Sequence, residues 1–542
     1  MRPLPHSPDL TAELARRGLF FLEGPEYFQT LNAEFLPDPL LEELRKDIPL
    51  LAKFETDLGL LHINNEGTAT LVRSCAGGVP LYYWQVRDVF AISSTLHQRV
   101  HCFPEEPANI DPLVCAMHAS GVGVFPEGRT TVKGVRILEI GHLLKVSRRL
   151  HQPLMYWPIP RFEVSPMDPE AWLASAEMLK KTLLKKMDRE MSSSGNNLVS
   201  FSGGVDSSCV VALAGALSKP TATISFITPH RGDQAEQQRQ IQIGLAHAGI
   251  GQHLSEVLSN SLRARLAVQA PPLPQIQLHP VLNFLPRLVD LWGPVTLGGG
   301  EFADRLLGGR TQTIWDLARD SSLAGLRRYT TPRDFLGLSK ARALWLVTPM
   351  GKFRGSPFPV RLRPWARNDL NNEYTAWLEQ TIGRNDVLPR WHLRRRLMMN
   401  RAIPMNWEAC SRLGVRRVYP FLCRTILDLA LNSHPSDHFG VLPSGARSGP
   451  KRMLRRSLSE IVPREALYQA DKPRPRHPHA PDPLPTEFFS AARSQAGELG
   501  DVIASEALAT VWTAHFPEHD GLQVLGLLNI VNALRTRPLG ST

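Results

Sequence analysis

The stretch LVSFSGGVDSSCVV, at residues 198–211, constrains the fold of this chain more than any other part of its sequence. It begins with a short apolar run, which is typical of a buried strand in a parallel sheet. Two glycines follow, and because they carry no Cβ atom they let the backbone approach another group closely. The apolar residues that resume after two serines favour a helix. The stretch is therefore predicted to form a strand, a glycine-rich turn and a helix.

The polar residues of this turn favour a phosphorylated ligand, because backbone N–H groups at the start of a helix attract anions. A carboxylate such as Asp206 would repel phosphates unless it held a magnesium ion that bridges to them. The alternative is a tight strand–helix turn that serine and aspartate merely cap. The turn is not the GxxxxGK[ST] loop of ordinary NTPases, since no lysine follows. The predicted ligand-binding residues are Ser202, Gly203, Gly204, Asp206, Ser207 and Ser208.

Strand-like and helix-like segments alternate after this turn, as in ATISFIT (222–228) and DQAEQQRQIQIGLAHAG (233–249). Such alternation indicates a parallel sheet with helical crossovers. Before residue 166 the chain reads as short strands and turns, and residues 58–74 predict two strands around an Asn-Glu-Gly turn. An amphipathic helix is predicted at 168–191, and the later chain to about residue 470 reads as mostly helical. We therefore predict an α/β protein with domains at 1–165 and 166–542.

The net charge of +11 is compatible with nucleic acid, an anionic nucleotide, or an acidic or peptide substrate. The basic stretches at 390–401 and 414–424 lack the interleaved aromatics of a single-strand-binding platform. We therefore expect a solvated or phosphate-facing helix surface there and no nucleic-acid partner. No apolar stretch is long enough to span a bilayer, and the first residues do not resemble a signal peptide. We expect a cytoplasmic protein without a membrane partner.

The SGGVDSS turn resembles the pyrophosphate-binding loop of the ATP pyrophosphatase superfamily, and residues 295–310 resemble a second motif of its asparagine synthetase-like members. That motif reads approximately G-E-G-x-D-E-x-x-x-G-G, with Phe302 standing here for a usual glycine and Arg305 for a usual acid. The matching residues are Gly300, Glu301, Asp304, Gly308 and Gly309.

The resemblance implies that ATP binds across the first turn and Gly300, with Mg²⁺ on Asp206 and Asp304. It places Glu301 near the attacking amine, where a carboxylate could accept a proton. The alternative for Glu301 is an acid at a helix N-terminus, stabilised by the helix dipole.

Two later segments resemble the same family. Residues 414–424 are similar to G-x-E-x-R-x-P-F-L-D, with Cys423 in place of the usual aspartate, and are expected to pack the helical half. The aligned residues are Arg416, Pro420, Phe421 and Leu422. Residues 448–474 are similar to K-x-x-L-R…LP…K, which implies that Lys472 stabilises charge as pyrophosphate leaves. The spacing before Lys472 is one residue longer than usual, so Lys451 is the second candidate. For either residue the alternative is a surface lysine.

The first domain resembles the glutamine-hydrolysing domain of this family, a layered α/β fold that uses an N-terminal cysteine as its nucleophile. The resemblance lies at residues 73–83 and 129–142. Residue 2 here is Arg2, and no cysteine precedes Cys75. We expect a degenerate domain that does not release ammonia from glutamine and serves as a scaffold or docking surface.

The resemblance implies an AMP-forming carbon–nitrogen ligase that uses ATP and Mg²⁺. Three outcomes fit it: a β-lactam synthetase, a lasso-peptide macrolactam synthetase, or an asparagine synthetase fed by free ammonia. β-Lactam synthetases typically carry tyrosine at the position of Glu301, so we favour the macrolactam synthetase. Its substrate would be a precursor peptide, whose N-terminal amine attacks an adenylated Asp or Glu side chain. A peptidase and a leader-peptide recognition protein are the expected partners. A tRNA-modifying enzyme and a non-catalytic scaffold are the alternatives from other classes.

Overall fold

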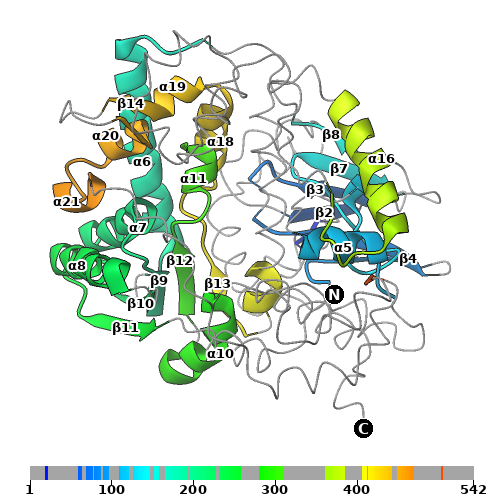
Figure 1. The fold of residues 1–542 in the computed structure, drawn as a ribbon, viewed down its shortest axis with the longest axis horizontal. Coiled ribbons are helices and arrows are strands. Elements are labelled where there is room, and N and C mark those ends of the chain that lie inside the picture. Colours follow the sequence, from blue (N-terminus) through cyan, green and yellow to red (C-terminus); the bar gives the residue numbers. More distant parts are fainter. Residues whose placement is uncertain are drawn as a thin grey trace.

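The structure is a computed structural model of the 542-residue chain, and it describes part of that chain. The described residues are 19–21, 59–63, 69–76, 78–86, 89–96, 109–120, 126–146, 152–157, 165–192, 196–227, 231–257, 280–293, 295–308, 361–384, 406–411, 413–441, 448–468 and 502–503. Figure 1 shows the parallel sheet with its helices in one half of the molecule and the antiparallel strands in the other.

The larger half is built on a five-stranded parallel sheet with the strand order β11-β10-β9-β12-β13. This confirms the predicted α/β class and the alternation of strands with helical crossovers. The strands and the helices between them are β9 (Asn196–Ser200), α7 (Val205–Ala216), β10 (Thr221–Ile227), α8 (Arg231–Ala248), β11 (Gln252–Val257), α10 (Pro280–Trp292), β12 (Val295–Gly299), α11 (Ala303–Leu306) and β13 (Arg416–Arg417).

The strand order reverses beside the central strand β9. From β9 the chain moves outward to β10 and β11, then returns on the other side as β12, which pairs with the second edge of β9. Gly299 at the end of β12 lies opposite Ser200 at the end of β9. Ligands of open α/β sheets bind beyond the carboxyl ends of the strands at such a reversal. The two glycine-rich turns both start there.

Helix α6 (Pro169–Glu190) precedes the sheet and forms where the sequence predicts it. Asp168 caps it by accepting a hydrogen bond from the backbone N–H of Ala171 at 2.8 Å, and Pro169 occupies the first turn, where its missing N–H costs nothing. Buried side chains of α6, such as Leu183, share a core with α7 and with the C-terminal helices α18 (Arg424–Leu431), α20 (Arg452–Ser457) and α21 (Arg464–Leu467). The other C-terminal elements are α19 (Pro435–His438), β14 (Phe439–Val441) and β15 (Ser448–Pro450).

The N-terminal part consists of two antiparallel sheets, with strand orders β1-β2-β3-β7-β8 and β5-β4-β6. The two strands predicted within residues 58–74 are β2 and β3, which pair with Leu61 opposite Leu71. The turn between them lies outside the described residues. The elements are β1 (Leu19–Phe21), β2 (Gly59–Ile63), β3 (Ala69–Arg73), β4 (Tyr82–Val86), β5 (Val89–Ser93), α5 (Pro112–Ala119), the 3₁₀ turn η2 (Pro126–Gly128), β6 (Arg136–Ile137), β7 (His142–Val146) and β8 (Leu154–Met155).

Segments from the second half of the chain pack against these sheets. Helix α16 (Asn368–Arg384) lies against α5, as Figure 1 shows, and its Glu373 pairs with Arg129 at 3.0 Å. The side chain of Trp407 is buried in the apolar core of the N-terminal sheets. Next to it, the Glu408 carboxylate accepts a hydrogen bond from the backbone N–H of Leu96 at 2.8 Å, across 312 residues of sequence. Buried contacts therefore connect the N-terminal sheets with the second half of the chain. Within the described ranges, no helix combines the length and apolar character needed to cross a bilayer.

Candidate active site

The two glycine-rich turns touch because β9 and β12 are neighbours. The closest approach is at Gly300, directly after β12. A Cβ atom there would lie 2.7 Å from the Cβ of Asp206 and 2.7 Å from the backbone nitrogen of Ser207. Those contacts are closer than real Cβ atoms come, so only glycine lets the second turn rest against the first. Gly300, which was predicted to bind ATP together with the first turn, therefore lies beside that turn for a steric reason; its contact with ATP stays a prediction.

Replacing Gly300 by alanine is expected to force the turns apart. Overpacking of this kind costs about 1–3 kcal/mol, and it would displace Asp206 as well. We expect a lower free energy of unfolding in urea and weaker binding of ATP by calorimetry. The matched control is Gly298→Ala, because a Cβ at Gly298 would meet only the Val199 side chain, at an ordinary 3.9 Å. Equal losses in the two variants would contradict this account.

The first turn is shaped by hydrogen bonds among its own serines. The Ser207 hydroxyl accepts from the backbone N–H of Ser202 and donates to the carbonyl of Gly204, both at 3.1 Å. Gly203 has a φ of +73°, a conformation that glycine adopts without cost. Gly204 then begins α7 without a side-chain cap. The first N–H groups of α7 therefore lie at the end of β9, as an anion-binding turn requires.

The predicted residues of this turn differ in exposure. Ser202 and Gly204 are partly exposed, whereas Ser207 and Ser208 are buried. Ser208 belongs to α7, and its buried hydroxyl has no hydrogen-bond partner among the described residues. A Gln237 side chain from α8 donates to the carbonyls of Ser202 and Phe226, at 3.2 and 3.1 Å, and so holds the ends of β9 and β10 together.

An acid–lysine cluster lies between the two turns: Asp206 from the first, Asp304 from α11 and Lys451 from the start of α20. The Lys451 ammonium is 2.6 Å from a carboxylate oxygen of each aspartate. Asp206 and Lys451 are largely buried, with side chains 16% and 10% exposed, whereas Asp304 is 69% exposed. The cluster thus opens toward solvent on the side of Asp304. Three segments that are far apart in the sequence meet here.

The charged groups in this cluster shift one another's pKa values. Burial raises the pKa of Asp206 to about 6; the Lys451 ammonium opposes that rise and the Asp304 carboxylate adds to it. Burial disfavours the charged form of Lys451, but the two carboxylates outweigh burial and raise the pKa of its ammonium. Lys451 is therefore a fixed cation, and of the two lysines predicted from sequence it is the one the structure places at the site. Lys472 lies outside the described residues.

Asp206 and Asp304 fit the predicted magnesium site. Their carboxylates converge closely enough to share one ammonium, and carboxylate oxygens are ligands that Mg²⁺ prefers. Among the described residues, no group of three acidic, histidine or cysteine side chains is placed to hold a metal. Mg²⁺ commonly takes one or two carboxylates and completes its shell with water and phosphate oxygens. When bound here, the ion would be held by the two aspartates and would neutralise negative charge on the phosphates.

The backbone conformation at position 302 gives a reason for the glycine that the family motif has there. Phe302 has a φ of +72°, in the left-handed region that strains a bulky side chain. Its buried ring packs edge-to-face against Tyr419, with ring centroids 5.2 Å apart, and the Arg305 guanidinium lies 5.7 Å from the Phe302 ring centroid. The phenylalanine thus fills the space beside the turn with apolar surface. This packing offsets part of the backbone strain.

Arg417 is a site residue that sequence reasoning missed. Its buried guanidinium forms an ion pair with Glu301 and lies 5.3 Å from the Tyr419 ring centroid, at the end of β13. It also donates to the carbonyl of Leu297 at 3.3 Å.

Residues 414–424 were predicted to pack the helical half, and Phe421 and Leu422 do so. The second prediction for this stretch, a solvated or phosphate-facing helix surface, is wrong at Arg417, which is buried in strand β13 because that strand pairs with β12. Two adjacent arginines between apolar residues of a strand-like run were the signal. The partner of Arg417, however, depends on β13 pairing with β12.

Glu301 stands at the edge of the site, next to Gly300, and its carboxylate is oriented by Arg417. Its predicted contact with the attacking amine stays a prediction. Cys423, which replaces the usual aspartate, stands at the N-cap of α18, where aspartate is a favoured residue because it can accept from the exposed N–H groups. The replacement of aspartate by cysteine therefore leaves α18 without a side-chain cap at its N-terminus.

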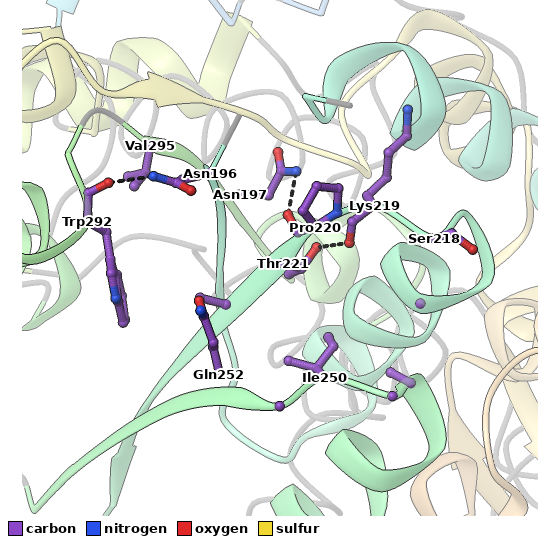
Figure 2. A pocket seen from close by; sticks show the side chains of 15 residues that line it. Asn196, Asn197, Ser218, Lys219, Pro220, Thr221, Ile250, Gln252, Trp292 and Val295 are labelled. Atoms are coloured by element: carbon purple, nitrogen blue, oxygen red, sulfur yellow. Dashed lines mark hydrogen bonds between the residues drawn. The ribbon is translucent and has the colours of Figure 1, made fainter. Parts of the chain in front are cut away.

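Figure 2 shows a pocket at the amino ends of the parallel strands, at the opposite end of these strands from the two glycine-rich turns. Its lining includes the first residues of four strands, Asn196, Thr221, Gln252 and Val295. There the Asn197 side chain donates to the carbonyl of Pro220 at 2.8 Å. Both glycine-rich turns follow the carboxyl ends of the strands, so this pocket is separate from the candidate active site.

Two glycine-rich turns at a strand-order reversal, with an acid–lysine cluster between them, form the arrangement that open α/β proteins use to bind phosphorylated ligands. Residues 178–519 match the protein family described as asparagine synthase. Because this match spans more than half of the chain, the protein belongs to the asparagine synthase family, whose members are ligases that use ATP, typically with Mg²⁺, to form amide bonds. No curated protein matches the chain.

Proposed function

We propose that this protein adenylates a carboxylate of a precursor peptide and joins it to the peptide's own N-terminal amine, closing a macrolactam. The observation that carries the adenylation step is the cluster of Asp206, Asp304 and Lys451 between the two turns. It supplies carboxylates for a metal-bound triphosphate and a buried ammonium for its negative charge. ATP-dependent amide formation follows from the family; the peptide substrate and the ring are the proposal.

The first step forms an acyl-adenylate. The substrate carboxylate oxygen attacks the α-phosphorus of ATP, and the bond to the β-phosphate oxygen breaks, releasing pyrophosphate. The N–H groups at the start of α7 and the Lys451 ammonium are proposed to bind the phosphate oxygens, where charge develops. Lys472 is proposed to add a second cation. Gly300 lets the second turn pack directly against Asp206, so both turns can face the same phosphates.

The second step exchanges AMP for an amine. The amine nitrogen attacks the acyl carbon, the carbon–oxygen bond to AMP breaks, and the proton leaves the nitrogen. Glu301 is the proposed acceptor of that proton, with its carboxylate oriented by Arg417. Both reacting groups belong to one peptide, so binding them together would raise their effective concentration.

The preference for a peptide over other substrates rests on features of the sequence. A glutamate at 301 argues against a β-lactam synthetase-like reaction. Among the departures from the family motif, Arg305 favours a substrate other than aspartate, and the net positive charge suits an anionic peptide or nucleotide. A peptidase and a leader-peptide recognition protein are the proposed partners.

The test is exchange of labelled pyrophosphate into ATP by the purified chain. The substrates compared are aspartate, small β-amino acids, and a synthetic peptide with an internal Asp or Glu, each with wild type and Asp206→Asn. Exchange that requires the peptide and is lost in Asp206→Asn supports the proposal. Exchange with aspartate would instead indicate an ammonia-using asparagine synthetase. Exchange with a β-amino acid would indicate a small-ring cyclase.

A further inference from the structure

Lys451 occupies the space in which two carboxylates meet. Its ammonium lies 2.6 Å from an oxygen of Asp206 and 2.6 Å from an oxygen of Asp304. A divalent cation would need these same oxygens, and a metal ion and an ammonium cannot both sit at contact distance from them. Their like charges would also repel strongly at such a separation, most of all beside Asp206, whose side chain is only 16% exposed. Metal and lysine therefore compete for one place.

The backbone fixes Lys451 in that place. The residue has a φ of +61° and forms the N-cap of α20, and its carbonyl accepts the first hydrogen bond of that helix from Arg455 at 2.9 Å. Helix α20 packs against α6 and shares the central core. The Lys451 side chain is 10% exposed. Moving its ammonium away therefore needs a new anionic partner nearby, because an unpaired buried charge is costly.

A triphosphate offers what a free cation does not. Its oxygens can pair with the Lys451 ammonium and at the same time supply ligands to a divalent ion. We propose that Lys451 closes the Asp206–Asp304 pair to a free divalent cation, so that the site accepts the metal only together with a triphosphate. This inference rests on the proposed function, because it assigns that triphosphate to ATP. It makes Lys451 a positioning residue for the metal as well as a phosphate contact.

The experiment is a titration of the purified chain with Mn²⁺ in the absence of nucleotide, with free Mn²⁺ measured by electron paramagnetic resonance. The central variant is Lys451→Gly, because glycine adopts a φ of +61° without strain. We expect Lys451→Gly to bind Mn²⁺ at least about tenfold more tightly than wild type, since a full positive charge leaves the two carboxylates. Lys451→Asn, which also tolerates this conformation, is the second variant. Circular dichroism melting checks the fold of each.

Two controls locate the effect. Asp304→Asn added to Lys451→Gly should remove the gained Mn²⁺ site, because it removes one of the two carboxylates. Lys181→Ala should bind Mn²⁺ as wild type does: Lys181 is a 76% exposed lysine of α6, 3.9 Å from Glu177. The proposal is overturned if wild type already binds Mn²⁺ in an Asp304-dependent way as tightly as Lys451→Gly. It is also overturned if the gained site persists in the double variant.

This result is independent of the proposed reaction. The titration contains no ATP and no peptide, so it reports only whether Lys451 blocks the carboxylate pair. Failure of the pyrophosphate exchange would leave the titration result standing. Conversely, tight Asp304-dependent Mn²⁺ binding by wild type would overturn the role given to Lys451 without affecting adenylation.

Discussion

Pyrophosphate exchange by Asp206→Asn is expected to fall by about 10²–10³-fold relative to wild type, the range for losing one preorganised charge in an active site. The substitution keeps the size of the side chain but removes a buried carboxylate that contacts Lys451 at 2.6 Å. Both the proposed metal ligand and the partner of the lysine would be lost together. The measurement is the initial exchange rate with the substrate that wild type accepts.

The control for this loss is Asp188→Asn. Asp188 is also an aspartate paired to a lysine, Lys219 at 2.9 Å, but its side chain is 64% exposed and it lies on α6. Exchange in Asp188→Asn should stay within about twofold of wild type, as for surface substitutions away from a site. Near-normal exchange in Asp206→Asn would remove this residue from the mechanism.

The buried carboxylate also predicts a pH dependence of stability. Burial raises the pKa of Asp206 from 3.8 to about 6 in the folded chain, so the folded state binds this proton more tightly than the unfolded state. The contribution of Asp206 therefore favours folding at low pH and declines as the pH rises through about 6. Urea unfolding across this range should show that decline in wild type. Asp206→Asn should lack it, since asparagine does not titrate.

The second large effect is expected at the Glu301–Arg417 pair. Glu301→Gln would leave the buried guanidinium of Arg417 without its counter-charge, and breaking a buried pair costs about 3–5 kcal/mol. Because the Glu301 side chain is 22% exposed, water can reach the gap, and we expect about 2–3 kcal/mol here. The measurement is the free energy of unfolding in urea.

A double variant separates loss of the pair from loss of a charge. Glu301→Gln with Arg417→Met should recover part of the lost stability, because no unpaired charge remains, and the four chains together form a double-mutant cycle. For activity, Glu301→Gln should keep pyrophosphate exchange while losing amide formation, since the proposed role of Glu301 comes after adenylation. Equal loss of both steps would place Glu301 in ATP binding instead.

The strand–turn–helix form of the first turn could be predicted from the sequence because it depends on local features. SGGVDSS needs a strand before it and a helix after it, and both follow from the apolar pattern around it. Phe302 shows the limit of that approach. The sequence indicates only an unusual residue, whereas the structure gives its cause, a positive φ that glycine would meet without strain and that packing on Tyr419 compensates.

Contacts between distant segments could not be predicted in the same way. The pairing of Glu301 with Arg417 requires β13 to lie beside β12. Strand β13 has only two residues and carries no periodic signal of its own. Likewise, nothing near Trp407 and Glu408 in the sequence points to the N-terminal sheets that they contact.

The sequence by itself determined the parallel α/β class and the strand–turn–helix form of the first glycine-rich turn, because both follow from residue types at short spacing. Its resemblance to a known family pointed to Asp206, Glu301, Asp304 and Lys451 as candidates. Only the tertiary structure decided that Lys451 lies between the two aspartates and that Arg417 orients Glu301. The physical reason is that strand order brings these segments together: β12 returns beside β9, and α20 packs onto the same core. Distances across a sheet depend on that order, which local patterns do not encode.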